Sequence, residues 1–356
     1  MEYRRMGRTG LKVSTLCLGT MTMGKQVDEP TSLGIIERAL DLGVNFIDTA
    51  DLYVNGVTEQ IVAKAIKGKR DSVVVASKGG HVRQLSGRYG EQKISGPIDI
   101  ARPKAFTPWQ AGAEIGPNDM GLSRKHLMQA LEGSLKRLGT DYLDIYYAHM
   151  PDYDTPLDET LRAMDDMVRQ GKVRYLGCSN FRAFQLGQAL RISDLHNLAR
   201  WEVIQPPFNL LARDVEYELL PLCLDEGVGV VPFSPMAAGL LSGKYEKGKE
   251  PIQGARYSLG HMGYNYNRPY WNDANFAAIE QLKMIAAAAG MVMPRFALAW
   301  VLSNPAITAV SNGATSVAQL EENLAATDVK LSQDALAACN AVWLTLRPPL
   351  TVFYGR

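Results

Sequence analysis

The chain has 356 residues, and its 38 Lys and Arg against 37 Asp and Glu give a formal net charge of +1. A chain so evenly charged has no field that would attract nucleic acid or an anionic membrane, so the expected partner is a small neutral or locally recognised molecule. The length fits one α/β barrel with inserted loops, and we expect a single domain over residues 1–356, with two smaller domains as the alternative.

The amino terminus lacks the apolar core of a signal peptide, and no apolar run approaches the roughly 18 residues of a membrane span. The cysteines are far apart and form no CxxC pair, which is typical of buried free thiols in a reducing compartment. They are Cys17, Cys178, Cys223 and Cys339. We therefore expect a soluble cytoplasmic protein.

The chain opens with EYRRMGRTGLKVS, whose turn at residues 7–10 predicts a β-hairpin that could plug the floor of a barrel. Eight short apolar runs rich in β-branched and aromatic residues follow, as expected for parallel strands buried on both faces. They cover residues 15–21, 45–48, 72–78, 143–149, 173–179, 201–206, 229–234 and 306–310.

Helical patterns lie between these runs, each with one apolar face. Two examples are Leu127, Leu131, Leu135 and Leu138, and Leu157, Leu161, Met164 and Val168. Glycines that would end helices in a left-handed cap stand at positions 43, 139, 171 and 227. Eight alternations of strand and helix favour a (β/α)8 TIM barrel over an open doubly wound sheet.

Three segments fall outside the repeat. Residues 80–122 and 235–272 form long loops after the third and seventh strands, and LSQDALAACNAVW predicts an extra carboxyl-terminal helix. We expect the first loop to fold over the site as a lid that shapes substrate choice, a disordered surface loop being the alternative. Its aromatic and basic residues include Arg88, Tyr89, Arg102, Phe106 and Trp109.

Polar residues recur at the carboxyl ends of the strands, where barrel enzymes build their active sites. The second strand ends at Asp48 with Tyr53 following, the third at Lys78 and the fourth at His149. Their convergence predicts acid–base chemistry, and no HxxxH, HxxE or Cys/His spacing predicts a metal site. The alternatives are a core histidine at His149 and a purely structural ion pair between Asp48 and Lys78.

The run DTADLYVNGVTE, residues 48–59, resembles the D-T-A-x-x-Y-x-x-G-x-x-E signature of the aldo-keto reductases, which are NAD(P)H-dependent barrel enzymes. Six further segments resemble the same family in the same order along almost the whole chain. They are GRTGLKVS, ASKGG, LKRLGTDYLDIYYAHMPD, GKVRYLGCSNF, PFSPMAAGLLSGKY and GATSVAQLEENLAA.

The resemblance implies a role for each of the four residues. Tyr53 would be the general acid that protonates the carbonyl oxygen during reduction. The reference pKa of a phenol is about 10, so Lys78 would supply a neighbouring cation and Asp48 would hold that ammonium in place. His149 would orient the substrate oxygen.

The resemblance also implies a cofactor site along the barrel rim, because no GxGxxG follows an early strand as a Rossmann fold requires. Ser179, Asn180 and Gln205 would hold the nicotinamide carboxamide, and Phe233 would stack on the ring. The turn after the seventh strand would wrap the pyrophosphate, an ordinary Gly-rich loop being the alternative. Its residues are Ser234, Pro235, Met236, Gly239, Leu240, Gly243 and Lys244, and the rim residues Gly19, Thr20, Met21 and Asp48 complete this part.

The segment expected to meet the adenine end is Gly313, Thr315, Ser316, Gln319, Glu322 and Asn323. Many family members place an arginine or lysine here to hold the 2′-phosphate of NADP, and this chain has neither between residues 311 and 323. The segment is similar to that of the potassium-channel β subunits and their relatives, which bind NADP, and Arg256 matches a phosphate-facing arginine in them. The resemblance therefore implies NADP(H), with NAD(H) not excluded.

Two functions follow from the resemblance. The first is a carbonyl reductase or alcohol dehydrogenase acting on an aldehyde, ketone, sugar or xenobiotic. The second is an NADP-binding regulatory or interaction protein of the channel β-subunit type with little turnover. The substrate, the direction of the reaction and the oligomeric state do not follow from the sequence.

Overall fold

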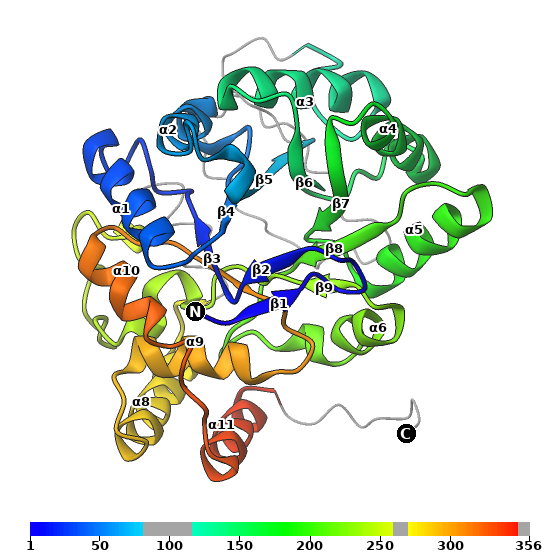
Figure 1. The fold of residues 1–356 in the computed structure, drawn as a ribbon. Helices are drawn as coiled ribbons and strands as arrows, with labels where there is room; N and C mark the ends of the chain where they lie inside the picture. Colours follow the sequence, from blue (N-terminus) through cyan, green and yellow to red (C-terminus); the bar gives the residue numbers. More distant parts are fainter. Residues whose placement is uncertain (81–115, 259–269, 348–356) are drawn as a thin grey trace.

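The structure is a computed structural model that describes residues 1–80, 116–258 and 270–347. Eight parallel strands form one curled sheet in the order β10-β3-β4-β5-β6-β7-β8-β9, with helices around its outside (Figure 1). An isolated parallel bridge joins Val230 of β9 to Ile307, just before β10, and brings the two edges of the sheet together. The chain is a (β/α)8 barrel, as the alternation in the sequence predicts.

The strands of the barrel begin and end within a few residues of the predicted runs. They are β3 (Leu16–Gly19), β4 (Phe46–Asp48), β5 (Val74–Gly79), β6 (Leu143–Ala148), β7 (Val173–Ser179), β8 (Trp201–Gln205), β9 (Gly229–Val230) and β10 (Val310–Asn312). The prediction of 229–234 for the seventh strand is too long, because Pro232 has no N–H for a ladder. The eighth strand pairs with β3 from Val310 to Asn312, so the prediction of 306–310 begins and ends too early.

The described helices fill the gaps between strands. They are α1 (Glu29–Asp41), α2 (Val57–Ala65), α3 (Arg124–Leu138), α4 (Leu157–Arg169), α5 (Ala183–His196), α6 (Leu219–Glu226), α8 (Asp273–Ala288), α9 (Met293–Ser303), α10 (Val317–Leu324) and α11 (Gln333–Leu346). In α3 the four leucines of the predicted stripe are buried, Ser123 caps the amino end and Gly139 caps the other end in the left-handed conformation. The predicted helix before the carboxyl terminus is α11.

The hairpin of β1 (Tyr3–Arg5) and β2 (Lys12–Ser14) crosses one end of the barrel (Figure 1). Met6 and Val13 are fully buried in the cluster of side chains that fills the barrel interior. The turn lies against the start of β9, where Arg8 N donates to Gly227 O at 2.8 Å. A Cβ at Gly7 would lie 2.3 Å from that same oxygen, so this contact requires glycine. The predicted plug is present.

The remaining expectations concern the lid, the cysteines, a membrane span and the number of domains. Residues 81–115 of the expected lid, with Arg88, Tyr89, Arg102, Phe106 and Trp109, lie outside them. The four cysteines are free and buried, as predicted. Among the described helices no single one is long and apolar enough to cross a membrane, although α8 and α9, bent by 89° at their junction, pass that test as a pair. The expectation of one domain stays a prediction.

Candidate active site

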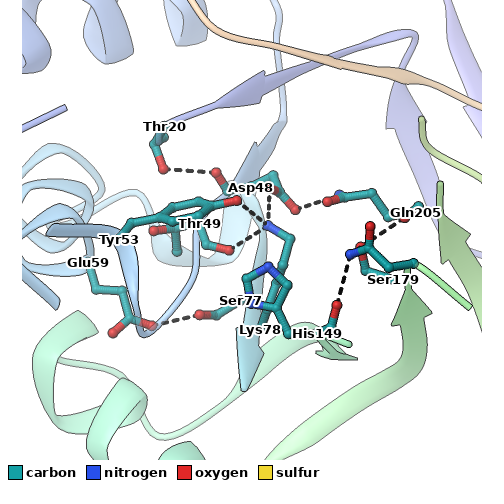
Figure 2. Close-up of polar contacts among 11 residues, drawn as sticks. Thr20, Asp48, Thr49, Tyr53, Glu59, Ser77, Lys78, His149, Ser179 and Gln205 are labelled. Carbon is teal, nitrogen blue, oxygen red and sulfur yellow. Dashed lines mark hydrogen bonds and ion pairs between the residues drawn. The ribbon is translucent and has the colours of Figure 1, made fainter. Parts of the chain in front are cut away.

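The carboxyl ends of three neighbouring strands bring the four predicted catalytic residues together. Asp48 ends β4, Lys78 lies near the end of β5, and His149 directly follows β6. Tyr53 opens a short 3-10 turn, η1 (Tyr53–Gly56), that leads into α2. Figure 2 shows Asp48 and Tyr53 both bonded to the Lys78 amine.

Lys78 is the centre of this cluster. Its side chain is fully buried, and Nζ donates to the Asp48 carboxylate, to Thr49 O at 2.9 Å and to Tyr53 Oη at 3.2 Å. Three acceptors use the three protons of an ammonium. Burial favours a lower pKa for Lys78, but the charge of Asp48 and the contact with Tyr53 outweigh it and raise the pKa above its usual value. The amine therefore stays a cation at neutral pH.

Asp48 is held from the side opposite Lys78 as well. Gln205 Nε2 donates to Asp48 Oδ2 at 2.9 Å, and Thr20 Oγ1 donates to the Asp48 carbonyl at 2.8 Å (Figure 2). Both Asp48 and Gln205 are buried. A buried ion pair offsets its desolvation cost only when its remaining polar atoms are also bonded, and these contacts meet that condition.

Tyr53 is half-buried and faces His149 edge-on, with the ring centroids 6.3 Å apart and the planes at 80°. His149 is 9% exposed. Its backbone N–H donates to Gly79 O at 2.9 Å, and its backbone carbonyl accepts from Asn180 Nδ2 at 3.0 Å. The backbone of His149 is thus fixed between β5 and the end of β7. The imidazole thus lies beside the phenol that bonds the Lys78 amine.

Ser179, Asn180 and Gln205 form one chain of hydrogen bonds beside this cluster. Asn180 Nδ2 donates to Ser179 Oγ at 3.0 Å, and Ser179 Oγ donates to the Gln205 carbonyl at 2.8 Å. Asn180 adopts a left-handed backbone with φ of 66°. Since the Gln205 amide also bonds Asp48, the predicted carboxamide-binding residues and the predicted catalytic residues belong to one network.

The segment after β9 carries an unusual run of left-handed residues. Ser234, Ala237 and Ala238 have φ of 54°, 46° and 59°, and Gly239 follows at 97°. Such strain in residues other than glycine persists only where surrounding contacts impose it, and it is concentrated at ligand sites. Asn209 Nδ2 donates to Ser234 O at 3.0 Å and Tyr257 Oη donates to Ala237 O at 2.7 Å, so contacts of this kind are present.

The other predicted residues of this segment differ in exposure. Phe233, Met236, Gly239 and Gly243 are half-buried, whereas Pro235 and Leu240 are buried. The side chains of Pro235 and Leu240 therefore belong to the packing of the loop.

Lys244 and Arg256 lie close enough to affect each other. Partial burial lowers the pKa of Lys244, and the positive charge of Arg256 lowers it further. Next to them Tyr245, Tyr257 and Trp271 pack in pairs, with ring centroids 5.1 to 5.4 Å apart. Two like charges held side by side on a packed aromatic base suit an anionic ligand.

The predicted adenine segment begins where β10 meets β3. A Cβ on Gly313 would lie 3.0 Å from Gly19 O, so the two strand ends approach closely. Ser316 caps α10, and Gln319 Oε1 accepts from both the N–H and the hydroxyl of Thr315 at 2.7 and 3.0 Å. Asn323 Nδ2 donates to Gly313 O at 3.4 Å. These polar groups therefore hold the segment's own shape.

Arg295 of α9 is the residue that the sequence analysis missed in this region. Its Nε and Nη2 each donate to the Glu322 carboxylate at 3.1 Å. The guanidinium is therefore paired with an acidic residue of the predicted adenine segment. No local pattern signals it, because Arg295 is 27 residues away in the sequence.

Thr20 and Met21 lie in the turn after β3, and Thr20 is buried against Asp48. Within residues 1–80, 116–258 and 270–347 no group of three or more His, Cys, Asp or Glu side chains could hold a metal ion. The candidate site brings a carboxylate, an ammonium, a phenol and an imidazole together beside the amides of Asn180 and Gln205.

Comparison with known proteins shows the family of the chain. A probable voltage-gated potassium channel subunit beta of Arabidopsis thaliana is 38% identical over 331 residues, which cover 92% of each chain. The uncharacterized oxidoreductase YrpG of Bacillus subtilis is 36% identical over 351 residues, which cover 96% of each chain. Versiconal hemiacetal acetate reductase of Aspergillus parasiticus is 32% identical over 345 residues, 94% of this chain and 95% of the relative. The family model of the aldo/keto reductases matches residues 15–344, and the chain belongs to that family.

Proposed function

We propose that this oxidoreductase reduces an aldehyde or ketone with NADPH, or runs the reverse oxidation of the alcohol, and that Tyr53 transfers the proton. The observation that carries the proposal is the buried Lys78 amine, which bonds the Asp48 carboxylate and the Tyr53 phenol together. A structural ion pair would not need a phenol as its third partner.

The chemistry of the chain's own residues follows from these contacts. As Tyr53 gives its proton to the carbonyl oxygen, negative charge develops on the phenol oxygen, 3.2 Å from the Lys78 ammonium. A cation at this distance stabilises that charge and makes the phenol a stronger acid. Asp48 keeps the ammonium in place, and the His149 ring beside Tyr53 orients the substrate oxygen.

The residues along the rim suit a nicotinamide dinucleotide, which supplies the hydride when bound. Ser179, Asn180 and Gln205 are positioned to hold the carboxamide beside the proton donor, and half-buried Phe233 is positioned to cover the ring. Lys244 and Arg256 supply positive charge for the phosphates. We favour NADP(H) over NAD(H) because two adjacent cations match a ligand with an extra phosphate.

The second candidate is a cofactor-binding regulatory or interaction protein. The similarity to a probable potassium channel subunit beta favours it. Turnover separates the two candidates, since an enzyme gives a steady rate over a panel of aldehydes and ketones with NADPH. A binding protein gives at most one slow turnover for each bound cofactor.

The decisive experiment replaces Tyr53 by Phe. The ring still fills its place, so NADPH affinity should stay within about twofold, while reduction of an aromatic aldehyde should slow by about 100-fold or more. Lys78→Met should act in the same way, and the double variant should be no slower than either single one, because both disable one proton-transfer unit. Tyr217→Phe, at an exposed tyrosine, is the matched control. Near wild-type turnover in Tyr53→Phe would assign the proton to His149 or to water.

A further inference from the structure

A buried polar cluster lies behind β5, next to the candidate site but outside it. Glu59 in the first turn of α2 is fully buried, and its carboxylate accepts from Ser77 Oγ at 2.6 Å and from Arg137 Nε at 2.6 Å. Arg137 comes from α3 and also donates to Ser134 Oγ at 3.2 Å. Figure 2 shows the bond between Glu59 and Ser77, with Lys78 beside it. One carboxylate thus joins a strand and two helices.

The position of Ser77 links this cluster to the Lys78 amine. Successive side chains of a strand point to opposite faces, so Ser77 bonds on the helix side of β5 while Lys78 bonds Asp48 on the inner side. The strand is therefore held by charged groups on both faces at two consecutive residues. Movement of β5 at this point would move the amine away from Tyr53.

Arg137, at the other end of the cluster, packs against the turn η1 that carries Tyr53. Val54 and Asn55 adopt left-handed φ of 47° and 55°, which is unusual for a β-branched residue, and Gly56 follows at 90°. Strained conformations of this kind persist only where surrounding contacts impose them, so the turn needs support from its surroundings. A Cβ at Gly56 would lie 2.5 Å from Arg137 Cδ, which shows that the arginine packs directly on the turn.

Stability alone does not explain a buried ion pair at this place. Well-packed apolar residues of similar volume often stabilise a core as well as a buried pair of charges does. The pair of Glu59 and Arg137 does provide directed bonds, which fix the start of α2 relative to β5 and α3. Tyr53 lies on the first of these elements and Lys78 on the second.

We propose that Glu59, with Ser77 and Arg137, is a positioning device that sets the contact between the Tyr53 phenol and the Lys78 amine. Their side-chain bonds join them to one another and to Ser134, so they act through the turn of η1 and through β5. The expected effect on rate rests on the proposed proton transfer by Tyr53. The expected change in the contact between the Tyr53 phenol and the Lys78 amine does not depend on that function.

The test uses Ser77→Ala, which removes one link and leaves the Glu59–Arg137 pair intact. We expect kcat for aldehyde reduction to fall by about tenfold, with KM and NADPH affinity within about twofold, because small misplacement of a reacting group slows chemistry more than binding. Ser77→Thr keeps the hydroxyl, so its kcat should be close to that of the wild type. Asp144→Asn is the matched control, since Asp144 pairs with Arg70 at 2.8 Å and accepts from Val75 N of the same strand β5 at 2.9 Å.

A second readout does not require turnover. In protein labelled with ¹³Cζ-tyrosine, the Tyr53 resonance is identified by its loss in Tyr53→Phe. Its chemical shift should differ from that of the wild type in Ser77→Ala, and it should be close to the wild-type value in Ser77→Thr and in Asp144→Asn. Wild-type kcat and an unmoved Tyr53 resonance in Ser77→Ala would overturn the proposal. If the wild type shows no turnover, the proposed function fails, and the resonance alone decides whether the device exists.

Discussion

At the scale of single residues, Lys244 and Arg256 place two positive charges close together. Their repulsion is unfavourable in the free protein and favours the binding of an anion. Partial burial and the charge of Arg256 lower the pKa of Lys244, and the aromatic side chains beside them pack the loop that carries both. A bound anion turns this repulsion into attraction. Which phosphate each cation meets can be tested by comparing two cofactors that differ in one phosphate group.

The first prediction concerns Arg256→Ala. If Arg256 binds the 2′-phosphate, its loss removes one charged hydrogen bond of roughly 1.5 to 3 kcal/mol, and NADPH affinity falls by about ten- to 100-fold. NADH affinity should stay nearly constant. Cofactor titrations followed by protein fluorescence measure both. Lys247→Ala removes an exposed cation from the same loop and is the control; an equal loss for NADPH and NADH would place Arg256 on the pyrophosphate instead.

At the scale of elements, the sequence predicted those features that depend on local pattern. The stripe of leucines in α3, the glycine caps and the eight strands in order follow from periodicity and backbone freedom, and the structure confirms them. The limits of β9 and β10 were wrong because Pro232 and the meeting of the two sheet edges decide them.

The predicted catalytic residues could be named because each lies at the carboxyl end of a strand or in the turn that follows it, and their roles stay predictions. The Glu59 cluster could not be found in the same way. Its partner Arg137 is 78 residues away in the sequence, and an acidic residue in the first turn of a helix is ordinary. Arg295 was missed for the same reason, because only tertiary packing brings α9 to Glu322.

The second prediction belongs to the loop between β6 and α4. Asp152 accepts from Leu122 N and Thr155 Oγ1, both at 2.7 Å, and it ties this loop to the approach of α3. Burial opposes ionisation of Asp152, but these bonds outweigh it and lower its pKa. A lowered carboxyl pKa contributes stability above the ordinary value of about 4, and that stability is lost as the pH falls through the folded value.

Asp152→Ala should therefore lower the free energy of unfolding at pH 7 by about 1–3 kcal/mol. The difference from wild type should shrink as the pH falls below about 4, because the wild-type carboxyl then becomes protonated. Urea unfolding at pH 7 and at acid pH measures this. Asp154→Ala, at an exposed carboxyl in the same turn, should change little at either pH. A difference that is constant with pH would show that the bonds of Asp152 do not depend on its charge.

At the scale of the whole molecule, the two ends of the barrel differ in the kinds of contact that they contain. The end that β1 and β2 cover is closed by the buried side chains of Met6 and Val13, by backbone hydrogen bonds and by partly exposed arginines of the hairpin (Figure 1). The opposite end, where the strands finish, collects the buried charges, the strained turns and the adjacent cations. Conserving a fold while varying its loops is easiest when stability and chemistry are separated in this way.

The last prediction tests that separation with Met6→Ala. Met6 is fully buried under the barrel, and a Cβ at Gly229 would lie 2.6 Å from its sulfur, so the side chain fills its space completely. Its truncation should lower the free energy of unfolding by about 2–5 kcal/mol, because a cavity replaces the side chain. Turnover and NADPH affinity, measured well below the unfolding transition, should equal those of wild type. Met284→Ala, at a methionine that is 66% exposed, is the control for the loss of a methionine. A clear fall in kcat for folded Met6→Ala would show that packing at the closed end of the barrel also sets the geometry of the Tyr53 and Lys78 contact.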